Sequence, residues 1–237
     1  MIKFSADYKK LNNGIQNNQD QIGLNFKWVD ALQLYCRDTS GVRRYLNFAS
    51  GGAVIDRTVI KPFVEDWVDF NSEIDRFENL QKEWQGNDSL VVILFGNNDL
   101  KGLARTGLRE DDMANCHRLA ASVISGARRL YDLGARSFLF LTTPPVELTP
   151  QGTLPHEGGY NDRNITAAAT IMLNDYLKAA VAKFESDLTE VNAMLFDSEA
   201  FFRLLIEMPE AFGLTDPVRY VFDIHGYKPP TGRMGFM

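Results

Sequence analysis

The stretch Leu90-Val-Val-Ile-Leu-Phe-Gly-Asn-Asn-Asp-Leu100 decides the fold class. Its first six residues are all apolar, which is typical of a short strand covered on both faces within a parallel sheet. A glycine and three polar residues follow directly, so we expect the strand to end in a polar loop. Open α/β sheets bind ligands at the carboxyl ends of their strands. This loop is therefore the first place to look for functional side chains.

Outward from this stretch, short apolar runs alternate with longer helical patterns, which indicates βαβ units and a parallel sheet. The other strand candidates are Ile2 to Phe4, Arg44 to Phe48, Phe138 to Thr142 and Ala193 to Phe196. Helical patterns are expected over Leu24 to Tyr35, Trp67 to Trp84, Leu119 to Tyr131, Ile165 to Glu185, and through Phe201 to Ile206. Thr149 to Asp162 is rich in Gly, Pro and polar residues and is predicted to be a long loop. Without an internal repeat or linker, residues 1–237 are predicted to form a single α/β domain.

Composition narrows the classes of partner. The chain carries a net charge of −6 and lacks a clustered basic stripe, so neither nucleic acid nor an anionic membrane is expected to bind. No apolar run reaches the length of a membrane span, and the first ten residues lack the apolar centre of a secretory leader. We therefore expect a cytoplasmic protein. Its two cysteines, Cys36 and Cys116, lie in unrelated segments, so no disulfide framework, metal site or cofactor is predicted.

Three segments resemble signature blocks of the SGNH/GDSL hydrolases, particularly their fungal acetylesterase-like branch. Asn47-Phe-Ala-Ser-Gly-Gly-Ala-Val-Ile-Asp56 resembles the second block, which supplies a glycine amide to the oxyanion hole. Phe95-Gly-Asn-Asn-Asp-Leu100 resembles the third block, Gly-x-Asn-Asp, whose asparagine donates its side-chain amide. Tyr131-Asp-Leu-Gly-Ala-Arg-Ser-Phe-Leu-Phe-Leu-Thr-Thr-Pro-Pro145 is similar to the fourth strand of that branch. The resemblance covers nearly the whole chain and implies a flavodoxin-like three-layer sandwich with five parallel strands.

The first family block departs from the pattern. The family begins with Phe-Gly-Asp-Ser, whose serine is the nucleophile, whereas this chain has Phe4-Ser-Ala-Asp-Tyr8. Matching Phe4 and Tyr8 places Asp7 at the position of the serine. Ser5 is the nearest serine, but it would lie two residues too early.

The last family block departs as well. The family carries its base histidine just before a proline, whereas this chain has Phe222-Asp-Ile-His-Gly-Tyr-Lys-Pro-Pro-Thr231. Aligning the Phe, the Tyr and the first Pro places Lys228 at the histidine and His225 at the acid. A shifted register instead keeps Asp223 as the acid and His225 as the base. We prefer the first register because three residues anchor it.

These substitutions change the chemistry that the resemblance implies. An Asp attacking an acyl carbon would form an anhydride, so Asp7 is better suited to act as a general base. Lys228 would stabilise negative charge as a cation, and His225 could relay a proton. Asn98 and the amide of Gly52, or of its neighbour Gly51, would remain as oxyanion donors.

The resulting hypothesis is non-covalent acid–base cyclisation of an acyl or polyketide-like small molecule to a lactone or pyrone, in small-molecule biosynthesis. One alternative is a weak GDSL-type esterase that uses Ser5 or water activated by Asp7. Another is an inactive relative that binds a ligand or partner in the old cleft. Each site residue also has a structural alternative: Asp7 as a cap, Lys228 and His225 as surface residues, and Asn98, Gly51 and Gly52 as turn residues. Phe63, Trp67, Phe201, Phe202 and Phe212 could line an apolar pocket or simply pack in the core.

Overall fold

The structure is a computed structural model, and it describes residues 46–80, 84, 86–104, 110–149 and 163–214. From Phe48 onward these residues belong to one compact unit. The strand predicted at residues 2–4 and the helix predicted at 24–35 lie outside the described residues. So does nearly all of the loop predicted over 149–162. The single domain predicted for residues 1–237 stays a prediction.

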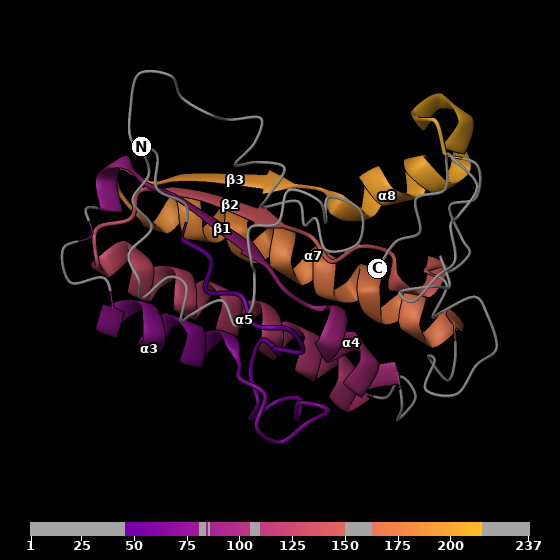
Figure 1. The fold of residues 1–237 in the computed structure, drawn as a ribbon, viewed down its shortest axis with the longest axis horizontal. Helices are drawn as coiled ribbons and strands as arrows, with labels where there is room; N and C mark the ends of the chain where they lie inside the picture. The colour runs from indigo at the N-terminus through magenta and orange to yellow at the C-terminus, as the bar shows by residue number, and fades with distance from the viewer. Residues whose placement is uncertain (1–45, 81–83, 85, 105–109, 150–162, 215–237) are drawn as a thin grey trace, which may run out of the picture. The chain divides into compact units, whose positions relative to one another are not determined.

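The described strands form a parallel sheet in the order β1-β2-β3 (Figure 1). They are β1 (Leu90–Leu94), β2 (Ser137–Leu141) and β3 (Asn192–Phe196). In register, Leu90 lies opposite Ser137, which in turn lies opposite Asn192. The α/β class and these three parallel strands are confirmed, whereas the predicted count of five is not. Of the strand predicted over 44–48, residues 46–48 are irregular, and the nearest strand-like pairing is an isolated bridge between Val54 and Asp69.

One described helix precedes β1, and the others lie between the strands or after β3. They are α3 (Phe70–Leu80), α4 (Asn97–Ala104), α5 (Glu110–Asp132), α7 (Arg163–Asp187) and α8 (Ser198–Glu207). Three short 3-10 turns, η2 (Gly86–Asp88), η3 (Val146–Leu148) and η4 (Pro209–Phe212), complete the described elements. None of the helices in this part of the chain is long and apolar enough to cross a membrane.

Helix α5 begins at Glu110 instead of the predicted Leu119. The beginnings of α3 and α4 differ from the sequence prediction for local reasons. Helix α3 begins at Phe70 instead of Trp67, because the Asp69 carboxylate accepts hydrogen bonds from the amide and hydroxyl of Ser72 and so caps the helix. Helix α4 was expected to be loop. It begins within the polar stretch after β1, where Gly96 has a φ of +118° and its carbonyl accepts the Leu100 amide at 2.9 Å.

The core lies between the sheet and the helix pair α5 and α7, which pack against each other on one side of the sheet (Figure 1). The strands follow one another in chain order, so right-handed crossovers place both helices on the same face. Phe138 and Phe140 of β2 are fully buried on this face, and both make ring contacts with Phe184 of α7. On the opposite face, Leu90 and Phe196 remain substantially exposed. The described helices α5 and α7 thus cover one face of an apolar sheet.

A backbone contact beside the sheet gives a test of this packing. A Cβ atom on Gly86 would lie 2.3 Å from the backbone of Gly134 and Ala135, which join α5 to β2. A backbone clash cannot be relieved by rotating a side chain, so Gly86→Ala should lower the free energy of unfolding by about 1–3 kcal/mol in urea titrations. Gly51→Ala is the matched control, because no described residue lies within 4 Å of its added methyl group. Equal stability of the two variants would contradict the packing described.

Candidate active site

A glycine turn forms one side of the candidate site. The Ala53 amide donates to the Ser50 carbonyl at 3.2 Å, which makes Gly51 and Gly52 the central residues of a turn. Gly52 has a φ of +84°, the conformation that a type II turn requires at this position and that favours glycine. A Cβ atom there would also lie 2.1 Å from the ring of Trp67. The hydrogen bond that closes the turn is donated by the Ala53 amide and does not involve the Gly52 amide.

Side chains from the first turn of α4 form hydrogen bonds with the residues that follow this glycine turn. The Asn98 side-chain amide donates to the Ala53 carbonyl at 2.9 Å. The Ile55 amide donates to the carboxylate of Asp99 at 2.9 Å. Two consecutive side chains therefore bind the Ala53 carbonyl and the Ile55 amide. We call this pair of hydrogen bonds the loop clamp. A primary amide carries two N–H groups, so Asn98 can hold the loop and still donate to a ligand.

Buried carboxyl groups support both sides of the loop. The Ser50 amide donates to Glu73 at 2.7 Å, and Glu73 is largely buried. Burial raises the pKa of Glu73 to about 7, outweighing the hydrogen bonds from Ser50. Asp99 is fully buried, and its second carboxylate oxygen has no hydrogen-bond partner among the described residues. Burial raises the pKa of Asp99 to about 7 as well.

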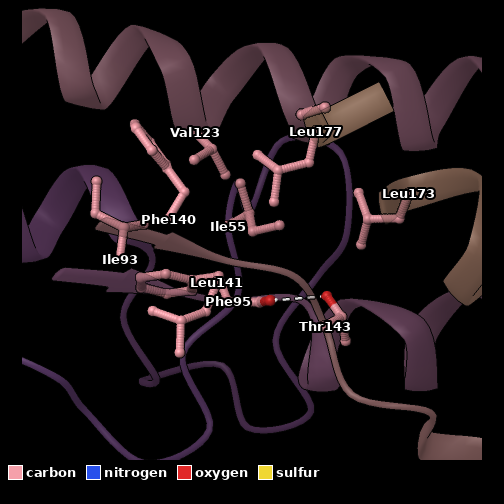
Figure 2. Close-up of a pocket in the computed structure, with 10 residues that line it drawn as sticks. Ile55, Ile93, Phe95, Val123, Phe140, Leu141, Thr143, Leu173 and Leu177 are labelled. Carbon is pink, nitrogen blue, oxygen red and sulfur yellow. Dashed lines mark hydrogen bonds between the residues drawn. The ribbon is translucent and has the colours of Figure 1, made fainter. Parts of the chain in front are cut away.

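The end of β2 fixes the loop after β1 from the other side. The Thr143 hydroxyl donates to the Phe95 carbonyl at 2.9 Å, the dashed line in Figure 2. A Cβ atom on Gly96 would lie 2.0 Å from that hydroxyl oxygen, so the two loops touch. Fully buried Asn174 of α7 accepts from the Thr143 amide at 2.8 Å and donates to its carbonyl at 2.9 Å. The apolar cavity in Figure 2 measures only about 10 Å³, room for at most about one water.

Helix α8 is tied to the same edge by charge. Arg203 bonds the buried Glu147 at 2.7 Å and Glu199 at 3.0 Å. Glu199 also accepts from the Asn174 side chain at 3.0 Å. Asp197 caps α8 through the Ala200 amide at 3.1 Å. The carboxyl edges of β1, β2 and β3 are thereby joined through side chains.

Only part of the predicted site can be compared with the structure. Asp7, His225 and Lys228 lie outside the described residues, as do the alternatives Ser5 and Asp223. Asn98 and the turn containing Gly52 are brought together, and their catalytic role stays a prediction. Of the aromatic residues considered for a pocket, Trp67 packs on the Gly52 turn and Phe202 lines a cavity. Within the described ranges, no group of three His, Cys, Asp or Glu side chains could hold a metal ion.

Sequence reasoning overlooked three supporting residues. Asp99 stands next to Asn98 and could have been assigned to the clamp from its place in the motif. Thr143 appeared only within the motif that contains the predicted strand, directly after that strand, and no role was assigned to it. Asn174 gave no signal, because a polar residue in a helical pattern is normally solvated.

Comparison with known proteins identifies the family. A family model described as GDSL-like lipase/acylhydrolase matches residues 7–227, a range that includes Asp7 and His225 and stops just before Lys228. An acetylesterase of Thermothelomyces thermophilus is 25% identical over 183 residues, which are 75% of this chain and 59% of that protein.

Two other relatives match over shorter stretches of this chain. A GDSL esterase/lipase of Arabidopsis thaliana is 27% identical over 68% of this chain and 43% of its own length. A thermolabile hemolysin of Vibrio parahaemolyticus is 25% identical over 63% of this chain and 32% of its own length. The chain thus corresponds to between a third and three fifths of each of these curated relatives.

The Thr143 contact can be tested with an isosteric pair of variants. Thr143→Val removes the hydroxyl and leaves the Phe95 carbonyl without that donor, which should lower the free energy of unfolding by about 1–3 kcal/mol. Thr143→Ser keeps the donor and should retain more of the stability in the same urea titrations. A valine variant as stable as the serine variant would show that the hydrogen bond does not hold the loops together.

The buried carboxyl groups predict a pH dependence of stability. The pKa of Glu73 is raised from its ordinary 4.5 to about 7, so the folded protein retains a proton that the unfolded chain releases. The resulting stabilisation is fully present below pH 4.5 and is lost as the pH rises to 7. Glu73→Gln removes the titration but keeps an acceptor for Ser50. Its stability relative to the wild type should therefore increase between pH 5 and pH 8, by on the order of 1–3 kcal/mol.

Asp99→Asn provides an independent second measurement, because its pKa is raised by burial in the same direction. Unfolding titrations at several pH values should show the same trend for this variant. Differences from the wild type that stay constant with pH, for both variants, would contradict the burial of these carboxyl groups.

Proposed function

Because the chain belongs to the GDSL-like lipase/acylhydrolase family, we propose that it stabilises the oxyanion of an acyl substrate at the carboxyl edge of its sheet. The donors are the Asn98 side-chain amide and the Gly52 amide, with Gly51 as the alternative. The loop clamp carries this proposal, since it holds the side-chain amide of Asn98 at 2.9 Å from the carbonyl oxygen of Ala53, the residue that follows Gly52. Donors fixed before the reaction stabilise developing charge without reorganisation, often the largest single contribution to catalysis.

For the reaction itself, we propose cyclisation with Asp7 as the general base. Asp7 takes the proton from a hydroxyl or enol of the substrate, and that oxygen attacks the acyl carbon of the same molecule. The carbonyl electron pair moves to oxygen, where Asn98 and Gly52 donate to it. Collapse of the tetrahedral intermediate expels the leaving group, which takes up the proton, and a lactone or pyrone remains. This scheme needs no nucleophilic serine, consistent with an aspartate at that position.

The last block contributes charge and proton transfer in this scheme. Lys228 would add a positive charge beside the oxyanion, and His225 would return the proton to the leaving group. In the shifted register, His225 is the base and Asp223 orients it. The two registers differ in the effect of Lys228→Met, which impairs turnover only in the first.

Hydrolysis of an acyl ester is the second candidate. Relatives bearing the names acetylesterase and GDSL esterase/lipase favour it. Ser5 or water activated by Asp7 would then attack the acyl carbon. The third candidate is a protein that binds an acyl ligand without turnover, for which loss of the Asp7 charge would be tolerated.

The Asn98 side chain gives the direct test of the proposal. Asn98→Ala removes the donor and should lower kcat by about 10²–10³, with a smaller change in KM. The assay follows lactone formation from a δ-hydroxyacyl thioester by mass spectrometry, alongside release of p-nitrophenol from p-nitrophenyl acetate. Asn79→Ala is the control, since Asn79 lies on the exposed surface of α3 and bonds only the Asp75 carbonyl within the described residues.

Two further measurements separate the candidate reactions. Asp7→Asn should abolish lactone formation, and a fluorophosphonate probe should fail to label the wild type. Labelling at Ser5 would establish the esterase and overturn the cyclisation. Wild-type kcat in a folded Asn98→Ala variant would overturn the oxyanion assignment itself.

A further inference from the structure

A second feature of the carboxyl edge is an apolar pocket between the loop after β2 and helix α8. It measures about 100 Å³. Its apolar walls are Pro144, Pro145 and Leu148 on the loop, and Phe202 and Ile206 on the helix. Phe202 and Ile206 are four residues apart and therefore share one face of α8.

The pocket adjoins the candidate oxyanion site through the chain itself. Asn97 lines it and is bonded directly to Asn98, whose side chain turns to the Ala53 carbonyl. The remaining lining residue, Thr149, is uncharged and follows η3. A substrate whose carbonyl oxygen reaches Asn98 would therefore have this pocket beside its acyl chain.

The charges around the pocket select against an anionic ligand. Among the residues that the structure describes, those lining it are all uncharged. Arg203 follows Phe202 in α8, but it is already bonded to Glu147 at 2.7 Å and Glu199 at 3.0 Å. These two ion pairs engage the guanidinium, which weakens its attraction for a carboxylate or phosphate group of a ligand. The lining thus suits a neutral hydrocarbon chain.

The volume sets the length of that chain. The pocket volume is about 100 Å³, whereas a cavity that holds a single water has a volume of about 10–15 Å³. The pocket therefore has room for a group of a few carbon atoms and not for a long fatty chain. The ion pair between Arg203 and Glu147 fixes the two walls relative to each other, because Glu147 immediately precedes Leu148.

We propose that this pocket binds a short, neutral acyl chain, and that Phe202 and Ile206 of α8 set the length it accepts. The proposal deepens the proposed function and rests on it for the identity of the ligand as an acyl group. Binding at the pocket is nevertheless separate from stabilisation of the oxyanion. The two can therefore fail independently.

The experiment titrates the full chain with 2-alkanones of four to ten carbons, which are neutral carbonyl compounds that are not hydrolysed. Binding is followed by NMR through the backbone amides of Asn97, Leu148, Thr149 and Ile206. Affinity should increase about fourfold per methylene up to about 2-hexanone and then stop increasing. In Phe202→Ala, the increase should continue for at least two more carbons.

Phe201→Ala is the matched control, because Phe201 is the neighbouring phenylalanine of α8 and does not line the pocket. It should leave the chain-length profile unchanged. If Phe202→Ala does not fold, Phe202→Leu and Ile206→Ala give the same comparison with smaller losses of contact.

Three results would overturn the proposal: shifts confined to amides outside the pocket, affinity that increases through 2-decanone in the wild type, or an unchanged profile in the Phe202 and Ile206 variants. Asn98→Ala should retain ketone binding while losing turnover. Turnover of Asn98→Ala therefore tests the proposed function, and its ketone chain-length profile tests the pocket separately.

Discussion

The loop clamp is the constraint on which the rest of the candidate site depends. Asn98 and Asp99 reach from the first turn of α4 to the Ala53 carbonyl and the Ile55 amide, both at 2.9 Å. These two bonds fix a segment that forms no extended strand of its own and makes only the bridge between Val54 and Asp69. The positive φ of Gly52 and the Trp67 ring then set the direction of the turn before the clamp. The clamp thus connects Asn98 on α4 to the loop that contains Gly52, the other candidate oxyanion donor.

Hydrogen bonds from the end of β2 also hold the loop after β1, from which the clamp residues of α4 follow. Thr143 bonds the Phe95 carbonyl, and Asn174 bonds both backbone groups of Thr143, so hydrogen bonds connect the loops after β1 and β2. Glu199 and Arg203 extend these contacts to α8 and Glu147. An unpaired buried polar group would cost about 1–3 kcal/mol, so these partners depend on one another for stability. The wall of the apolar pocket is consequently built on the same network as the oxyanion loop.

Local patterns in the sequence were enough to predict the sheet but not the clamp. The apolar runs at β1, β2 and β3 place each strand within one residue of its observed bounds, although the described helices cover only one face of these strands. Asn98 and Gly52 could be selected because the motifs around them are local. Helix α4 was missed since it is only eight residues long and begins in a polar stretch that is equally typical of a turn. Asn174 could not be found, since its partner Thr143 is 31 residues away and only the fold brings them together.

Binding of a tetrahedral anion at the Asn98 amide tests the central claim most directly. The measurement is the NMR signal of the Asn98 side-chain amide during titration with a methyl alkylphosphonate, a mimic of the tetrahedral oxyanion. The account predicts that one of the two amide protons shifts downfield on binding, while the proton donated to Ala53 keeps its position. A phosphonate that binds without moving either proton would contradict the assignment of Asn98 as an oxyanion donor.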